Sequence, residues 1–318
     1  MISVTALGEV LIDFTDAGVS EGGQKLFERN AGGAPANVLV ALQRMGFETA
    51  FIGKIGNDMH GEFLRGTLTS NGVNCDGLIT DPDFFTTLAF VALDEQGDRS
   101  FSFARKPGAD TQIRPEEIDE RIIRNSRIFH IGSLSLTDEP ARSATHHALE
   151  LAKEAGCVLS YDPNYRANLW PNVGAAMEQM RSVLPMMDLV KISDEECGLL
   201  TDFDEPEAAA AAIVEQGASV CVVTVGGDGA YVRTAEGGEI VPPFPAGVVD
   251  TTGAGDSFWG GFLSAFLESN LEPAKVTLAD AKMMVRVGNA VASLCVRKRG
   301  GIPAMPTRPE VEALLDAH

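Results

Sequence analysis

The sequence predicts an α/β protein whose mostly parallel sheet is covered by helices on both faces. Short apolar runs of strand length alternate with helical segments through most of the 318 residues, which is the pattern of a parallel sheet between two layers of helices. Hydrophobic residues make up 45% and charged residues 22% of the chain, as in an ordinary globular protein. One segment, near residues 84–107, breaks the alternation and predicts a small additional sheet.

The first predicted elements flank a glycine-rich turn. Residues 1–9 and 49–52 are apolar runs that predict strands. Between them a helix begins near Pro35, a residue suited to the first helical turn, and ends at Gly46. Another helix is predicted around residues 61–70. The start of the chain is therefore expected to alternate strand, helix, strand, helix.

The same alternation continues in the second half of the chain. A helix is predicted at residues 141–155, and strands are predicted at residues 127–131, 158–161, 189–192 and 220–225. Because each of these short apolar runs lies near a helical segment, we expect the four strands to join one sheet. We expect residues 1–318 to form a single domain.

The segment that interrupts the alternation of strands and helices predicts a hairpin. Residues 87–93 and 100–105 read as two antiparallel strands, joined by a turn at residues 94–98. We expect residues 12–31 and 84–107 to form a discontinuous β lid over the edge of the main sheet where α/β proteins bind ligands. The alternative is a hairpin that simply packs on the core.

Charge and cysteine content limit the classes of partner. A net charge of −20 argues against nucleic-acid binding, and no apolar run reaches the length of about 18 residues that a membrane span needs. The odd number of scattered cysteines predicts no disulfide framework and no zinc site; they are Cys75, Cys157, Cys197, Cys221 and Cys295. We therefore expect a cytoplasmic protein.

The most informative motif is the sequence DTTGAGD at residues 250–256, which leads into an apolar helix. Its glycines leave backbone N–H groups uncovered at a helix start, a site that attracts anions. Asp256 lies in the first turn of that helix. A carboxylate beside a phosphate site fits a general base that takes a proton from an attacking hydroxyl. The alternative is an aspartate that only stabilises the helix start.

Two further glycine-rich turns are weaker evidence for a ligand-binding site. Residues 32–37 (GGAPAN) allow a ligand close to the backbone, and Asn37 can donate and accept hydrogen bonds. Residues 224–229 (TVGGDG) directly follow a predicted strand. Each could be an ordinary connecting turn. The chain has neither a GxxxxGK[ST] loop nor a GxGxxG fingerprint, so a hydride-transfer enzyme is disfavoured.

Residues 32–61 and 250–263 resemble the two signatures of the ribokinase-like (PfkB) family of carbohydrate kinases. The resemblance extends over essentially the whole chain and is strongest to the bacterial and plant fructokinases. The segments that carry this finer likeness are residues 7–14, 129–136, 162–166, 169–170 and 190–196. The ribokinases proper have Lys-Gly where this chain has Ala34-Pro35, which disfavours ribose. The resemblance implies a ribokinase-like three-layer fold with a small β-sheet lid.

The resemblance also implies a role for each matching residue. Asp256 would be the catalytic base, and Gly253, Ala254 and Gly255 would form the anion hole. The residues implied to bind the sugar are Asp13, Gly32, Gly33, Asn37, Phe103, Arg105 and Arg166. Those implied to bind the nucleotide are Lys191, Ser193, Thr224, Gly226, Gly229 and Asn289. Ser193 stands where the family's N-x-x-E motif has Asn, and Glu196 takes the acidic place.

The implied reaction is phosphorylation of D-fructose by ATP, with Mg²⁺ organised by Glu196 through water. Asp250 and Thr252 resemble a monovalent-cation site for K⁺. One alternative is a 2-keto-3-deoxygluconate kinase, whose substrate carboxylate could pair with Arg105 and Arg166. Another is a sugar-binding regulator without activity. A lid with exposed strand edges also predicts a homodimer formed through the lids.

Overall fold

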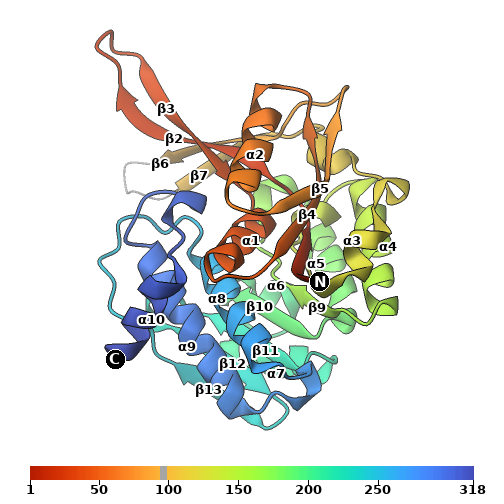
Figure 1. Cartoon of the computed structure of the whole chain (residues 1–318), viewed down its shortest axis with the longest axis vertical. Helices are drawn as coiled ribbons and strands as arrows, with labels where there is room; N and C mark the ends of the chain where they lie inside the picture. The colour runs from red at the N-terminus through yellow and green to blue at the C-terminus, as the bar shows by residue number, and fades with distance from the viewer. Residues whose placement is uncertain (94–98) are drawn as a thin grey trace.

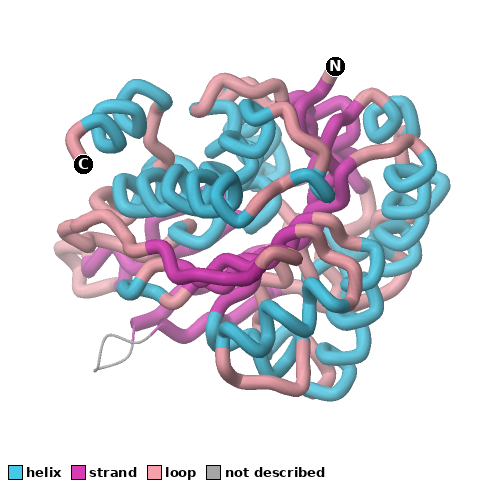
Figure 2. Tube along the Cα trace, turned by 90° about the horizontal axis from the view of Figure 1, so that it is seen from below, coloured by secondary structure: helices cyan, strands magenta, loops and turns pink. Residues whose placement is uncertain are grey.

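A nine-stranded sheet forms the middle layer of the molecule (Figures 1 and 2). The computed structural model describes residues 1–93 and 99–318, and the turn expected at residues 94–98 lies outside the described residues. In the order β13-β12-β11-β10-β9-β8-β1-β4-β5, the strands are Gly237–Val241, Ala230–Thr234, Val220–Thr224, Leu189–Ser193, Val158–Tyr161, Ser126–Ile131, Ile2–Leu7, Thr49–Gly56 and Asn74–Asp81.

The sheet confirms the predicted parallel arrangement. All strand pairings from β5 to β11 are parallel, and β12 and β13 add two antiparallel pairings at the edge. Strand β1 pairs with β4 on one side and with β8 on the other. The chain therefore adds β4 and β5 on one side of β1 and, later in the sequence, β8 and β9 on the other side. In an open α/β sheet, ligands bind at such a switch point, beyond the carboxyl ends of the strands.

Helices cover both faces of this sheet and complete three layers (Figure 2). One buried cluster joins the sheet to α1 (Ala34–Arg44), α2 (Met59–Ser70), α8 (Ala254–Ser269) and α9 (Leu278–Cys295). A second cluster joins it to α3 (Glu120–Arg124), α4 (Ala141–Glu154), α5 (Val173–Val183), α6 (Cys197–Leu200) and α7 (Pro206–Glu215). Helix α10 (Arg308–Asp316) packs on α9 near the C-terminus (Figure 1).

Helix α8 lies at the centre of the first cluster. The apolar side chains that the sequence places on one face are buried, and Trp259 stacks on Phe262 with ring centroids 4.6 Å apart. Small residues let neighbouring helices come close. A Cβ atom at Gly260 would lie 2.5 Å from Ala41 of α1, and one at Gly261 would lie 2.7 Å from Val291 of α9. This close packing fixes the start of α8 relative to α1.

The predicted small sheet is present and projects from the body (Figure 1). Its strands, in the order β3-β2-β6-β7, are Lys25–Gly32, Leu11–Val19, Leu88–Leu93 and Arg99–Ala104. The antiparallel pairing of β6 with β7 confirms the expected hairpin. Because side chains alternate between the faces of a strand, Asp13 and Thr15 lie on one face of β2, and Phe14 lies on the other.

Within residues 1–93 and 99–318, none of the helices combines the length and the apolar character that crossing a bilayer requires.

Candidate active site

Four neighbouring cavities line the carboxyl edge of the main sheet. The apolar cavity, about 580 Å³, is lined by Phe244, Val248 and Asn289 among others. The helix-start cavity, about 470 Å³, includes Lys191 and Gly255. We call the other two the central cavity, which contains Asp13, Asn37 and Asp256, and the distal cavity, which contains Phe103, Asn168 and Trp170; their volumes are about 150 and 690 Å³.

Shared lining residues place these cavities in a row. Gly226 and Ala254 line both the apolar and the helix-start cavities. Gly253 and Asp256 line both the helix-start and the central cavities. Among the described residues, Phe103 alone lines both the central and the distal cavities. Asp256 therefore stands between two cavities that could hold two reactants.

The start of helix α8 forms the boundary between the helix-start and central cavities. Gly253 adopts a left-handed conformation with φ of 74°, and no side chain caps the first turn. Gly253, Ala254 and Gly255 all line the helix-start cavity, so the positive end of the helix dipole faces it. An anion placed there would be stabilised by the N-terminal end of the helix. The role of these three residues as an anion hole stays a prediction.

Asp256 is held by two amide side chains. Its Oδ2 accepts a hydrogen bond from Asn37 Nδ2 at 2.8 Å, and its Oδ1 accepts one from Asn164 Nδ2 at 2.9 Å. Burial raises the pKa of Asp256 to about 6, and the nearby carboxylate of Asp162 adds to this rise, while Asn37 and Lys191 oppose it. The carboxylate is thus fixed in orientation, and its pKa lies close to neutral pH, as suits a general base.

A buried ion pair lies beside the start of α8. Lys191 Nζ is 2.7 Å from Asp162 Oδ2, and both side chains are almost fully buried. A Cβ atom at Gly255 would lie 2.9 Å from this ammonium group, which shows how closely the cation approaches the helix start. Burial alone would lower the pKa of Lys191, but Asp162 and Glu196 hold it above its ordinary value. Lys191 is therefore a fixed positive charge beside the start of α8.

Glu196 also belongs to this group of charges. Its Oε1 accepts the Tyr165 N–H at 2.7 Å, and its Oε2 accepts the Ser193 N–H at 2.8 Å. Burial raises the pKa of Glu196, with a further rise from Asp162 and an opposing effect of Lys191. Both Ser193 and Glu196 line the helix-start cavity, as does Thr224. The structure thus brings Ser193 and Thr224, which were predicted to bind the nucleotide, together with Glu196, which was predicted to organise Mg²⁺.

The glycines of the first turn make room for the central cavity. Gly33 has φ of 111°, and a Cβ atom there would lie 2.5 Å from the backbone oxygen of Glu9. A Cβ atom at Gly32 would collide with the carboxylate of Asp13. Gly33, Asp13 and Asn37 line the central cavity together with Phe103 and Arg166. The turn therefore requires glycine so that α1 can begin beside the cavity.

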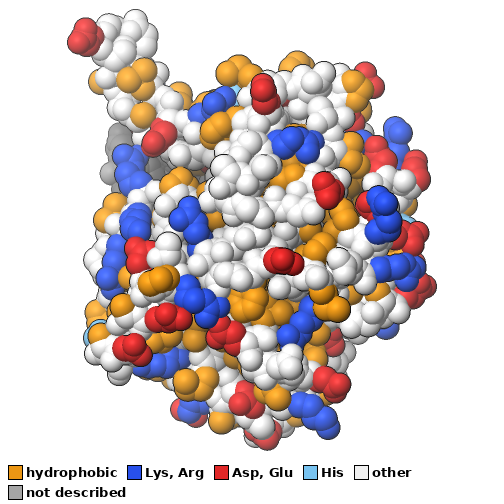
Figure 3. All heavy atoms as spheres, viewed as in Figure 1, with side chains coloured by type: hydrophobic (Ala, Val, Ile, Leu, Met, Phe, Trp, Pro, Cys, Tyr) orange, Lys and Arg blue, Asp and Glu red, His pale blue; other side chains and the backbone are white. Residues whose placement is uncertain are grey.

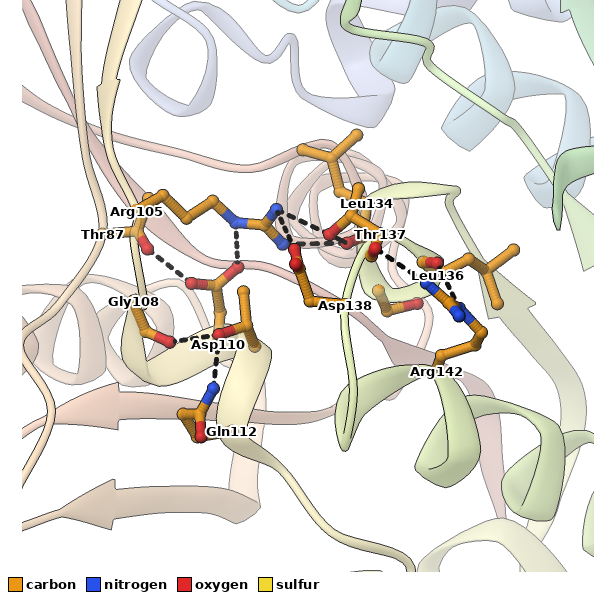
Figure 4. A network of polar contacts seen from close by, with 12 residues as sticks. Thr87, Arg105, Gly108, Asp110, Gln112, Leu134, Leu136, Thr137, Asp138 and Arg142 are labelled. Carbon is orange, nitrogen blue, oxygen red and sulfur yellow. Dashed lines mark hydrogen bonds and ion pairs between the residues drawn. The ribbon is translucent and has the colours of Figure 1, made fainter. Parts of the chain in front are cut away.

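Arg105 departs from the sequence prediction. Its guanidinium is buried in a network with Asp110, Thr137 and the carbonyl oxygen of Leu134, as Figure 4 shows, with contacts of 2.7, 2.8 and 2.8 Å. Arg105 lines the distal cavity and not the central one. The buried ion pair with Asp110 holds the guanidinium outside the central cavity, where the sugar site was predicted. In this structure Arg105 is part of the wall of the site.

Gly229 also has a different place from the one predicted. It has φ of 101°, and a Cβ atom there would collide with the carbonyl oxygen of Val241, so glycine is needed for the connection between β11 and β12. Gly226 and Asn289 do line the apolar cavity. The amide of Asn289 donates to the carbonyl oxygens of Val241 and Pro242 at 3.1 and 3.0 Å, which fixes the side chain in the cavity wall.

Asp250 and Thr252 join the loop before α8 to the loop after α9. Asp250 Oδ1 accepts from the backbone N–H and the hydroxyl of Thr252, at 2.9 and 2.8 Å, and its Oδ2 accepts the Gly300 N–H at 2.9 Å. Carboxylate and hydroxyl oxygens are ligands that suit hard cations. The arrangement fits the predicted cation site between these two loops, and the role itself stays a prediction.

Three residues of the site were missed by the sequence prediction. Asn164 holds Asp256, Asp162 pairs with Lys191, and Glu9 lines the central cavity. Burial raises the pKa of Glu9 to about 7, while the N–H groups of Glu9 itself and Ala34 lower it. Each residue follows a parallel strand closely, β9 or β1. A search for polar residues just beyond predicted strands would have found them.

Comparison with known proteins gives consistent matches over the full chain. The profile of the family described as "pfkB family carbohydrate kinase" matches residues 1–308. Probable fructokinase-4 of Arabidopsis thaliana is 41% identical over 318 residues, which covers 98% of this chain and 96% of the relative.

Two solved structures give a similar result. The ATP-bound fructokinase of Xylella fastidiosa superposes with a TM-score of 0.87 at 34% identity, covering 99% of this chain and 98% of that one. A double mutant of the Vibrio cholerae O395 fructokinase, bound to fructose, ADP and potassium ion, has a TM-score of 0.87 at 32% identity, with coverage of 99% and 98%. The two matches extend over the helix layers, the main sheet and the small sheet.

Proposed function

Because the chain belongs to the pfkB family of carbohydrate kinases and has the ribokinase-like fold that its sequence predicts, we propose that it phosphorylates D-fructose with ATP. The family and its ATP-dependent sugar kinase chemistry are shown by these matches. The product would be fructose 6-phosphate. The residue roles below are proposals that the geometry supports.

The observation that carries the proposal is the position of Asp256. It lies in the first turn of α8, where the uncapped helix start faces one cavity and the carboxylate faces the next. A phosphoryl group at the helix start and a hydroxyl beside the carboxylate would then lie next to each other. Such positioning, together with charge stabilisation, accounts for most of the catalysis in phosphoryl transfer.

The proposed reaction uses the residues of both cavities. The ionised carboxylate of Asp256 accepts the proton of the terminal sugar hydroxyl as that oxygen bonds to the γ-phosphorus of ATP. The bond from this phosphorus to the oxygen that bridges to the β-phosphate breaks, and ADP leaves. Lys191 and the start of α8 stabilise the negative charge on the transferring group. The base of the nucleotide would occupy the apolar cavity next to Asn289.

The acidic residues of the helix-start cavity fit the predicted Mg²⁺ role. Glu196 is buried and lines that cavity, and Asp162, the buried partner of Lys191, keeps an Oδ1 without a hydrogen-bond partner among the described residues. Mg²⁺ usually keeps several waters and needs only one or two carboxylates besides phosphates, so Glu196 would hold it through water. Bound Mg²⁺ would neutralise charge on the β- and γ-phosphates. Asp250 and Thr252 would hold K⁺.

The central cavity supports fructose over the keto acid. With Arg105 engaged in its own ion pair, Arg166 is the one arginine among the described residues that lines this cavity. The guanidinium pair expected for a substrate carboxylate is therefore not assembled there. The deciding experiment measures ADP release with Mg-ATP against D-fructose, 2-keto-3-deoxygluconate, ribose and glucose. The highest kcat/KM is expected for fructose; equal values for fructose and the keto acid would contradict the assignment, and no turnover would favour a sugar-binding regulator.

The pKa of Asp256 predicts a pH profile. A base must be ionised to act, so kcat/KM for fructose should fall as the pH drops below about 6, by about tenfold per pH unit. Asp162→Asn removes a neighbouring negative charge and should lower the pKa of Asp256, so the acid limb moves to lower pH. An acid limb that stays in place or moves upward in this variant would contradict the proposed coupling.

The small sheet would act as a lid and as a dimer interface. Phe14 and Phe90 stack on the face of the sheet opposite Asp13, where Phe14 also contacts His60 of α2, and Phe27 contacts both rings edge to face. Phe27 is 42% and Phe90 is 37% exposed, and hydrophobic side chains are visible along the projecting arm in Figure 3. Light scattering at micromolar concentration should give twice the chain mass, and Phe27→Asp should give a monomer. A monomeric wild type would remove the dimer proposal.

We also place the enzyme in the cytoplasm. All five cysteines are free, which suits a reducing compartment.

A further inference from the structure

The distal cavity is the largest of the four and has no role in the proposed function. It shares Phe103 with the central cavity, and it has no lining residue in common with the helix-start cavity among the described residues. It therefore lies on the far side of the central cavity from the phosphates. An acceptor whose reacting hydroxyl points to Asp256 would direct its opposite end toward Phe103 and the distal cavity.

One part of the wall between these two cavities is rigid. Arg105 Nε lies 2.7 Å from Asp110 Oδ2, and both side chains are 2% exposed. The same guanidinium bonds to the carbonyl oxygen of Leu134, which lines the central cavity, and lies 4.0 Å from Asp138, which lines the distal one (Figure 4). Because breaking a buried ion pair leaves an uncompensated charge, this part of the wall is fixed.

The other part of the wall is the ring of Phe103. This residue lies on β7 opposite Ala89 of β6, on the same face of the small sheet as Val91, which also lines the central cavity. The Phe103 ring is half-buried and carries no charge. Its truncation would therefore leave no unpaired ion. Phe103 is thus the part of the wall that can be removed with the smallest loss of folding stability.

The chemistry of the distal cavity suits a neutral polyhydroxyl group. Two cations, Arg105 and Lys106, and two anions, Asp138 and Glu139, line it, so its formal charges balance. An edge of the Trp170 indole also lines it, while most of that side chain is packed in the core. An apolar edge beside amide and carboxylate groups can contact the C–H groups of a sugar ring and bond its hydroxyls.

We propose that the distal cavity is a subsite for a second sugar ring, joined to the non-reacting end of the acceptor, and that Phe103 closes this subsite and restricts the enzyme to monosaccharides. The inference rests on the proposed fructose kinase activity. The reaction on a longer acceptor is the same transfer: the terminal hydroxyl oxygen bonds to the γ-phosphorus, the bond to the β-bridging oxygen breaks, and Asp256 takes the proton. Sucrose is a suitable probe, because its fructosyl unit has a free 6-hydroxyl group.

The test compares fructose and sucrose as acceptors in wild type, Phe103→Ala, Phe103→Tyr and Phe90→Ala, with the phosphorylated products identified by mass spectrometry. Phe103→Ala should shift the kcat/KM ratio toward sucrose by at least about tenfold. Phe103→Tyr keeps the wall and should keep the ratio. Phe90→Ala removes a ring from the opposite face of the same sheet and should also leave the ratio unchanged, which controls for a loosened lid.

A second variant locates the added ring. In the Phe103→Ala background, Asn168→Ala should raise KM for sucrose and leave KM for fructose unchanged, since Asn168 lines only the distal cavity of the two. An unchanged ratio in a folded Phe103→Ala enzyme that is active on fructose would overturn the inference. Phe103→Val repeats the test if the alanine variant unfolds. A wild type inactive on fructose would refute the proposed function instead. The subsite would then be tested by calorimetry: binding of sucrose to Phe103→Ala would support it, and no binding would contradict it.

Discussion

Asp256→Asn is expected to lower kcat for fructose phosphorylation by about 10²–10⁴-fold, the range that a positioned general base contributes. Asparagine has nearly the shape of aspartate and cannot accept the proton at neutral pH. Its amide oxygen can still accept a hydrogen bond from Asn37 or Asn164, which hold the native carboxylate. KM for fructose and the binding of ATP should therefore change little. Steady-state kinetics with calorimetric binding of each ligand measure both effects.

The same variant separates catalysis from stability. Burial raises the pKa of Asp256, so the ionised carboxylate is less favourable in the folded protein than in water, and its replacement by a neutral amide should not lower the melting temperature. Asp58→Asn is a matched control, because Asp58 caps α2 at another helix start and accepts from His60 and Gly61. Asparagine caps a helix about as well as aspartate, so this control should be fully active, with some loss of stability because Asp58 Oδ2 also accepts the Thr86 N–H. Substantial turnover by Asp256→Asn would refute its role as the base.

Lys191→Met is expected to lower the free energy of unfolding by about 3–5 kcal/mol, the usual cost of removing one partner of a buried ion pair. The change leaves the buried carboxylate of Asp162 without its cation. It also removes a positive charge from the proposed phosphate site, so kcat should fall as well. Chemical denaturation monitored by fluorescence measures the stability, and ADP release measures the activity.

A double variant distinguishes the two roles of Lys191. Lys191→Met combined with Asp162→Asn removes both charges and should recover much of the lost stability, because no unpaired ion stays buried. Activity should stay low, since the phosphate still lacks its cation. Lys282→Met provides the exposed comparison: Lys282 pairs with Glu239 at the surface, where such pairs contribute at most about 1 kcal/mol. A loss of stability equal to that of Lys282→Met would contradict a structural role for the Lys191 pair.

Local patterns predicted the elements of this protein well. The apolar residues after Asp256 form the buried face of α8, and Gly253 is the left-handed residue at the helix start. The hairpin around residues 87–105 was read from alternation and turn residues, and strands β6 and β7 confirm it. These features depend on neighbours in sequence, so the sequence alone can specify them.

Contacts between distant segments could not be predicted in the same way. Arg105 was expected at the sugar, and the structure places it in a buried ion pair with Asp110. Nothing in the local pattern separates a ligand-binding arginine from a structural one, because the choice depends on which carboxylate the fold brings near. Asn164 likewise meets Asp256 only because β9 and α8 meet at the same edge of the sheet.

The sequence by itself determined the α/β class, the order of the elements, the glycine-rich helix start predicted to bind an anion, and Asp256 as the candidate base. Each of these follows from periodicity, glycine conformation or a motif within one segment. The tertiary structure alone decided which polar groups surround Asp256, how far burial raises its pKa, and how Phe103 divides the central from the distal cavity. These properties depend on distance and burial, which arise only when the strands and helices pack together.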